Sequence, residues 1–283
     1  MPLTPVPRLI ELAGPGGLGA FNVITLEHAE AIAAAAEATE RPAILQISEN
    51  TVKYHGGLRP LGRACLAIAE DSTAALAVHL DHATDTALIR EAVELGLGSV
   101  MYDGAALAYG ENVAATAEIT RWCHEREVFV EAELGEVGGK NGAHAPGVRT
   151  DPDEAAAFAA ATGVDALAVA VGSVHAMQTR AALLDEELIT RLVAALDIPL
   201  VLHGSSGVPD EGLRAAVRHG MVKINYGTRL NIALTEAVRI ALAAAPGTSD
   251  PRKYLGPGRS GIQRDVEHHL RVIAARTLRA VPN

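Results

Sequence analysis

Short apolar segments alternate with helical patterns along most of the 283 residues, and this alternation constrains the fold most. Several of the apolar segments are almost continuously apolar, which is typical of parallel strands covered on both faces. Eight such segments are predicted as strands, at residues 20–25, 42–48, 74–82, 99–103, 128–134, 165–172, 199–204 and 222–227. Helical patterns fall between them, at 26–40, 84–96, from Asp151-Pro152 onward, and at 185–195, 209–218 and 229–244.

This order of elements predicts an α/β protein, and eight strand–helix units favour a (β/α)8 TIM barrel. An open, doubly wound sheet is the alternative, because it produces the same alternation. No shift in composition marks a domain boundary, so we expect one domain over residues 1–283. A turn-rich tail at 245–258 leads to an extra C-terminal helix at 259–279. The glycine-rich segment at 135–150 is predicted to be a mobile active-site loop, with a tolerated surface insertion as the alternative.

Composition narrows the range of partners. Lys and Arg number 24 against 34 Asp and Glu, and the net charge of −10 argues against nucleic acid or an anionic membrane surface as the partner. Cys65 and Cys123 cannot form a disulfide framework, which suits a reducing compartment. The first residues lack the pattern of a secretion signal, and no apolar run reaches the roughly 18 residues of a membrane span. We therefore expect a cytoplasmic protein whose partner is a small molecule.

Polar residues gather at the predicted strand ends, where the active site of a barrel lies. His82, His175 and His203 follow the third, sixth and seventh strands. Zinc accepts three imidazoles and, in catalytic sites, keeps one open position for a substrate oxygen. The alternative is that each histidine satisfies local backbone groups, but three at equivalent strand ends favour a metal site.

Asp81 precedes the first of these histidines and is placed to exchange a proton with a substrate oxygen. Alternatively, Asp81 orients a ligand imidazole, and His79 is predicted to be another residue that supports the metal ligands.

Two loops, Gly204-Ser205-Ser206-Gly207 and Asn225-Tyr226-Gly227-Thr228, lead into helices after the seventh and eighth strands. Backbone N–H groups at helix N-termini bind phosphate, and these two loops form the recurrent phosphate site of barrels.

Seven segments, in order along the chain, carry a resemblance to a known family. They are AFNV, HLDH, VMYD, VEAELGEVGG, DALAVAVGSVH, LVLHGSSG and KINYGT. The chain resembles the class II, zinc-dependent ketose-bisphosphate aldolases, and it looks closer to the tagatose-type branch. The resemblance implies a lyase of carbohydrate metabolism, including glycolysis. It would cleave fructose-1,6- or tagatose-1,6-bisphosphate reversibly into dihydroxyacetone phosphate and glyceraldehyde 3-phosphate.

The resemblance also implies roles for particular residues. His82, His175 and His203 match the zinc ligands, Asp81 matches the acid/base, and Asp103 and Glu133 match ligands of an alternative or second metal position. The phosphate of dihydroxyacetone phosphate and a nearby monovalent cation would lie at the two loops. The matching substrate-binding positions are Asn22, Ser48, Ala176, Gly204, Ser205, Ser206, Asn225, Tyr226, Gly227 and Thr228. A homodimer or homotetramer is implied, in which Arg264 of a neighbouring subunit reaches the second phosphate or, alternatively, is a solvated helix residue.

Two departures from the family pattern affect the predicted chemistry. Ala176 replaces a glycine, and its methyl group narrows the space near the substrate. The mobile loop lacks the glutamate that follows the glycine pair in the family and removes the donor proton. His144 is predicted as the replacement base, with Glu136 as an alternative, or the protein uses a different donor or aldehyde. Lys223 receives no role beyond a charge near the phosphate.

The sequence is also consistent with two other functions. A metal-dependent hydrolase barrel would use the ion to activate water, but such sites often have an aspartate on the eighth strand, where this chain has Asn225. A non-catalytic sugar-phosphate-binding barrel would explain the missing loop glutamate.

Overall fold

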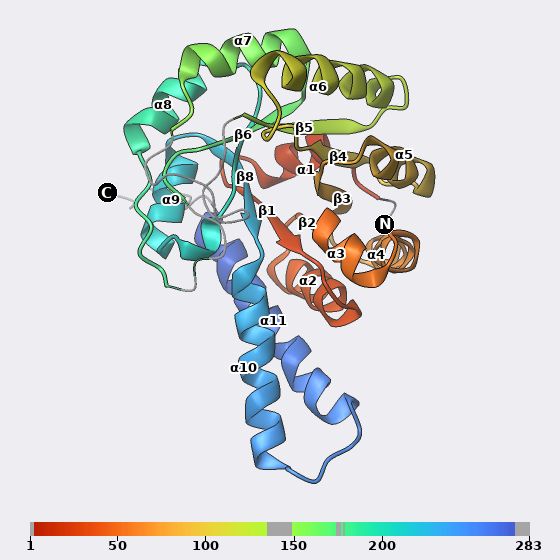
Figure 1. The fold of residues 1–283 in the computed structure, drawn as a ribbon. Coiled ribbons are helices and arrows are strands. Elements are labelled where there is room, and N and C mark those ends of the chain that lie inside the picture. The colour runs from red at the N-terminus through yellow and green to blue at the C-terminus, as the bar shows by residue number, and fades with distance from the viewer. Residues whose placement is uncertain (1–2, 135–148, 174–176, 178, 275–283) are drawn as a thin grey trace, which may run out of the picture.

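The computed structural model describes residues 3–134, 149–173, 177 and 179–274 (Figure 1). Its eight strands pair in parallel in chain order, and β1 pairs with β8, so the barrel is closed. The strands are β1 Leu18–Asn22, β2 Ala43–Ser48, β3 Leu76–Ala83, β4 Ser99–Tyr102, β5 Phe129–Leu134, β6 Ala166–Val169, β7 Leu200–Leu202 and β8 Met221–Tyr226. The TIM-barrel prediction is confirmed, and the open-sheet alternative is wrong.

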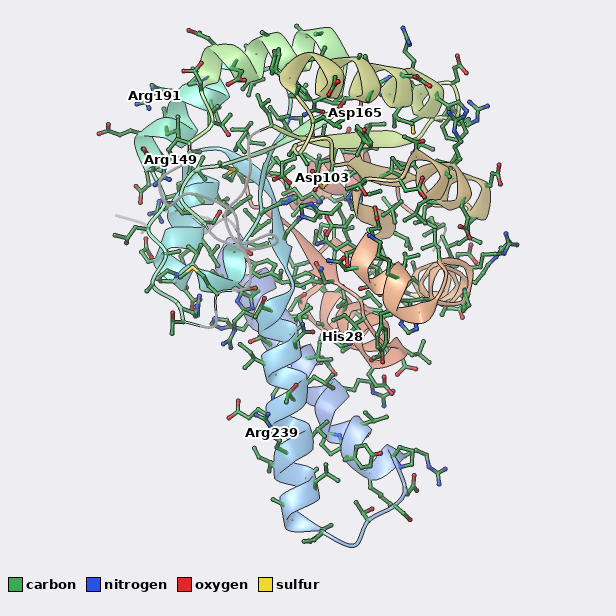
Figure 2. All side chains as sticks on the ribbon, viewed as in Figure 1. His28, Asp103, Arg149, Asp165, Arg191 and Arg239 are labelled. Carbon is green, nitrogen blue, oxygen red and sulfur yellow. The ribbon has the colours of Figure 1, made fainter. Side chains whose placement is uncertain are left out.

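Helices surround the barrel, and the last two extend away from it as a pair joined at the far end (Figure 1). Figure 2 places Arg239 on the extended part of α10. The helices are α1 Val6–Ala13, α2 Leu26–Thr39, α3 Glu49–His55, α4 Arg59–Asp71, α5 Thr86–Leu95, α6 Tyr109–His124, α7 Pro152–Thr162, α8 Glu186–Ala195, α9 Asp210–Arg218, α10 Thr228–Ala244 and α11 Arg252–Ile273, with a short 3-10 helix, η1, at Ser205–Gly207.

Several helix ends follow directly from local sequence. Asp151 accepts hydrogen bonds from the backbone N–H groups of Asp153 and Glu154, and Pro152 takes the first position of α7. Gly96 caps the C-terminus of α5, and its φ of +106° is accessible to glycine without strain. Both boundaries agree with the sequence prediction.

The start of the last helix was predicted wrongly. α11 begins at Arg252 rather than at residue 259, and Pro257 lies inside it. The glycines that suggested turns instead allow close packing of α11 on α10. A Cβ at Gly258 would lie 2.6 Å from Leu234 Cδ1, and one at Gly261 would lie 2.9 Å from the carbonyl oxygen of Ala233. Four further helices, α1, α3, α4 and α6, were not predicted from the sequence patterns.

Alternate strand residues face the inside of the barrel, and their character changes along the barrel axis. Near the strand starts these positions are apolar, as Leu18, Ile44 and Ala77 are, and they pack with Val6 and Leu9 of α1. The outward positions join the helices in the main hydrophobic core. At the carboxyl ends the inward positions become polar, and they are Asn22, Ser48, Asp81, Asp103, Glu133, His203 and Asn225.

Candidate metal centre and active site

The end of β3 brings two adjacent side chains to the same place. In a regular strand, Asp81 and His82 would face opposite sides of the sheet. Here the pairing of β3 with β4 shifts register between Leu80 and Ala83, and His82 has a φ of +50°. A non-glycine residue in this left-handed region is uncommon and strained, and such residues cluster at functional sites.

Two overlapping groups of potential metal ligands form at the carboxyl ends of the strands. One potential ligand atom from each of Asp81, His82 and His203 lies within 4.8 Å of the others, and the same is true of His82, Asp103 and Glu133. The rings of His82 and His203 are 4.7 Å apart and nearly perpendicular. The structure therefore brings together two of the three predicted histidine ligands, the predicted acid/base and both predicted second-position carboxylates.

The remaining predicted residues of the centre are His175, Ala176 and the loop base His144. All three lie outside the described residues, as does the alternative base Glu136 and most of the loop predicted at 135–150. Their roles stay predictions.

His82 is supported by Asp103, which follows β4 and is labelled in Figure 2. His82 Nδ1 lies 2.9 Å from Asp103 Oδ2 and 3.5 Å from Glu133 Oε2. A carboxylate only accepts hydrogen bonds, so Nδ1 carries the proton, and in the neutral ring Nε2 carries the lone pair.

His203 is supported from inside the barrel by Glu131 of β5. His203 Nε2 lies 2.9 Å from Glu131 Oε1, and Nδ1 lies 3.7 Å from Glu133 Oε2. The other oxygen of Glu131 accepts a 2.8 Å hydrogen bond from Lys223 Nζ of β8. By the same argument, Nε2 of His203 carries a proton, and in the neutral ring Nδ1 carries the lone pair.

Lys223, expected from the sequence to provide at most a charge near the phosphate, forms an ion pair with Glu131 inside the barrel. Lys223 is 2% exposed and Glu131 is fully buried. A signal was present in the sequence, because lysine and glutamate within apolar strands are almost never fully buried unless paired. The sequence did not reveal that they pair with each other across the barrel.

His79 lies deeper than the two candidate ligands and is fully buried. Its Nδ1 is 2.7 Å from Ser99 Oγ. Burial, reinforced by the nearby charge of Lys223, lowers the pKa of His79 well below its usual value, so the ring is neutral. Among the described residues no hydrogen bond joins it to His82 or His203, and its supporting role stays a prediction.

The two predicted phosphate loops lie side by side. Gly204, with a φ of +68°, turns the chain after β7 into η1, and Ser205 Oγ donates a hydrogen bond to the carbonyl oxygen of Asn225. Ser206 Oγ accepts from the backbone N–H of Arg229, in the first turn of α10. This arrangement provides small residues and a helix N-terminus at the strand ends, as a phosphate site requires.

Three predicted substrate contacts can be placed more closely. Asn22 lies beside Gly227, where a Cβ would meet Asn22 Cγ at 3.3 Å, and its Oδ1 accepts a hydrogen bond from Gln46. Ser48 Oγ caps α3 by accepting from the backbone N–H of Thr51. The ring of Tyr226 faces outward and stacks on Phe21 with 5.1 Å between centroids, so only its backbone can face a ligand.

Arg264 lies on α11, in a pocket of about 370 Å³ between α10 and α11 that Arg229 and His268 also line. Among the described residues, no hydrogen bond or ion pair joins Arg264 to the candidate metal ligands of its own chain.

Within the same described residues, no helix has the length and apolar character needed to cross a membrane.

The closed barrel and its histidine–carboxylate cluster define a TIM-barrel protein with a candidate divalent-metal centre at the usual active-site end. The family model described as "Fructose-bisphosphate aldolase class-II" matches residues 13–277. The chain belongs to the class II fructose-bisphosphate aldolase family, and it is therefore an aldolase-family lyase. This membership favours the aldolase hypothesis over a hydrolase barrel.

Individual relatives agree with this family. The fructose-bisphosphate aldolase of Geobacillus stearothermophilus is 39% identical over 264 residues, covering 92% of each chain. The fructose-bisphosphate aldolase of Staphylococcus epidermidis is 36% identical over 277 residues, covering 96% of this chain and 97% of the relative. The crystal structure of the YdjI aldolase from Escherichia coli K12 superposes with a TM-score of 0.84 at 27% identity, covering 96% and 97%. The family is generally zinc-dependent and acts on sugar phosphates.

Proposed function

We propose that this protein is a zinc-dependent aldolase that reversibly cleaves fructose-1,6- or tagatose-1,6-bisphosphate into dihydroxyacetone phosphate and glyceraldehyde 3-phosphate. The observation that carries the proposal is the convergence of Asp81, His82 and His203 at the carboxyl ends of strands from distant parts of the chain. The adjoining loops after β7 and β8 support a phosphorylated substrate.

The residues present fit a zinc ion. Imidazole nitrogens and carboxylate oxygens are its usual protein ligands together with thiolate, and the candidate ligand atoms converge within 4.8 Å. Asp81 Oδ1 is buried and has no hydrogen-bond partner among the described residues, so this polar atom faces a site that something else must complete. In this proposal His82, His203 and His175 hold the zinc, and Asp103 and Glu133 provide an alternative or second divalent position.

When bound, zinc supplies a Lewis acid that polarises a substrate carbonyl. Asp81 holds the proton that is transferred: it donates to the aldehyde oxygen in condensation and accepts from the corresponding hydroxyl in cleavage. Residues 204–206 and 225–228 bind the donor phosphate and orient the donor carbon toward the aldehyde. Asn22, aligned by Gln46, contacts the same substrate, and His144 removes the donor proton.

The proposal extends to the assembly and to a second cation. A homodimer or homotetramer would bring Arg264 of one copy to the second phosphate in another. A monovalent cation would lie near the donor phosphate. Both rest on the family resemblance.

The test is a substrate screen with a matched variant. Zinc-loaded and chelator-treated protein are assayed for release of dihydroxyacetone phosphate from both bisphosphates and from fructose 1-phosphate. We expect release from a bisphosphate only with zinc, and Asp81→Asn should lower kcat by about 10²–10⁴-fold while the zinc content stays unchanged. Absence of release from every ketose would refute the aldolase assignment. Equal turnover by the variant would remove Asp81 from the mechanism.

A further inference from the structure

Two charged side chains lie inside the barrel beneath the metal ligands, and the proposed chemistry makes no use of them. Glu131 is fully buried and Lys223 is 2% exposed. Removing a pair of ions from water costs several kcal/mol per ion, and well-packed apolar side chains of similar volume are often at least as stable. The packing of the barrel alone therefore does not explain this pair.

The geometry connects the pair to one metal ligand. Lys223 Nζ donates to Glu131 Oε2 at 2.8 Å, and Glu131 Oε1 is 2.9 Å from His203 Nε2. The three side chains come from β8, β5 and the end of β7, so the connection crosses the inside of the barrel. Each oxygen of the carboxylate thus has one donor, and the lysine supplies the countercharge that a buried carboxylate needs.

The direction of these hydrogen bonds determines which nitrogen of His203 can bind a metal. Because Glu131 can only accept, Nε2 carries a proton, and in the neutral ring Nδ1 carries the lone pair. Nδ1 is the nitrogen nearer Glu133, whose Oε2 lies 3.7 Å away. An imidazole that ligates a metal through one nitrogen usually donates from the other, and that donation fixes both tautomer and orientation.

We propose that Glu131 and Lys223 are positioning residues that hold His203 with Nδ1 directed at the metal. Glu131 fixes the tautomer and ring orientation, and Lys223 holds the carboxylate in place. This inference rests on the proposed function, because it takes His203 as a metal ligand. The competing explanation is that the pair serves only to fill and stabilise the barrel.

Two double variants separate these explanations by zinc affinity, measured by chelator competition on zinc-free protein. Glu131→Gln/Lys223→Met removes both charges but keeps an oxygen that can accept from Nε2. Glu131→Leu/Lys223→Met also removes both charges and leaves no acceptor. We expect the leucine variant to bind zinc about 10–100-fold more weakly than wild type, and the glutamine variant to remain close to wild type.

A control reports on disturbance of the barrel interior in general. Ser99→Ala removes the hydroxyl beside His79 and should leave zinc affinity unchanged. Equal zinc affinity of the two double variants would overturn the proposal and leave the pair a purely structural one.

A second measurement needs no folded variant of the pair. In wild-type protein with 15N-labelled histidine, long-range 1H–15N spectra report which ring nitrogen carries the proton, and a His203→Asn sample identifies the His203 signals. We expect a proton on Nε2. A proton on Nδ1 would overturn the proposal even if both double variants fail to fold.

A wrong ligand assignment and a wrong role for the Glu131–Lys223 pair give different results. If His203→Ala does not reduce zinc content, the ligand assignment is wrong, and both the proposed centre and this inference fall. If His203→Ala loses zinc but the two double variants bind it equally, only the inference falls.

Discussion

The two described histidines of the candidate metal centre are held in different ways. His82 lies at the rim of the barrel, has a left-handed backbone conformation and is next to the register shift between β3 and β4. Its partner Asp103 belongs to the loop after β4. His203 lies inside the barrel, and its partner Glu131 is a strand residue joined to Lys223. The side chain of His82 is 12% exposed, whereas that of His203 is fully buried. Glu131 is bonded to both His203 and Lys223, whereas Asp103 is also one of the candidate ligands of the second metal position.

The largest expected difference concerns stability. Lys223→Met leaves the Glu131 carboxylate buried without its countercharge, which should lower the free energy of unfolding by about 3–5 kcal/mol. Asp103→Asn keeps an oxygen that accepts a hydrogen bond from His82 and leaves no buried charge without a countercharge. We therefore expect it to lower the free energy of unfolding by only about 1 kcal/mol. Urea unfolding of both variants, with chelator present, measures the two losses. Similar losses would show that the interior pair and the rim pair do not differ in the way described.

The next effect concerns metal affinity at the rim. Asp103→Ala removes the oxygen that accepts from His82 and orients its ring, and we expect zinc binding to weaken by about 10-fold. Chelator competition under the conditions used for the Glu131 variants gives the comparison directly. A larger loss for Asp103→Ala than for Glu131→Leu/Lys223→Met would reverse the order of importance of the two supports.

The smallest effect extends the comparison to a histidine away from the metal. His28 of α2, labelled in Figure 2, is 1% exposed, and burial lowers its pKa. Because the unfolded chain binds a proton at His28 more readily than the native protein does, stability is full above about pH 6.5 and falls as pH drops below it. Each such histidine contributes up to about 1.4 kcal/mol per pH unit.

Urea unfolding of zinc-free wild type and His28→Gln between pH 7.5 and 5.5 tests this contribution. The variant should lose less stability than wild type as pH falls. Parallel pH profiles would contradict a depressed pKa at His28.

The barrel could be predicted from sequence because its signal is local. Eight apolar segments, the cap at Asp151 and the stop at Gly96 each reflect the chemistry of a few neighbouring residues. The convergence of Asp81, His82 and His203 was also predictable, because all parallel strands of a barrel end on the same face.

The remainder of the site required three-dimensional contacts. The pairing of Glu131 with Lys223 depends on how β5 and β8 face each other across the interior. The outward direction of Tyr226 depends on its place in the alternation of β8. The early start of α11 depends on the packing of Gly258 and Gly261 against α10. His175, Ala176 and His144 remain predictions from sequence.

The backbone conformation of His82 has an evolutionary consequence. At a φ of +50°, any side chain with a Cβ carries a local conformational cost of roughly 1–3 kcal/mol that glycine avoids. On backbone conformation alone, glycine would be the more relaxed residue at this position. If histidine is retained at position 82 during evolution, selection for the imidazole outweighs the conformational cost of a side chain at this φ.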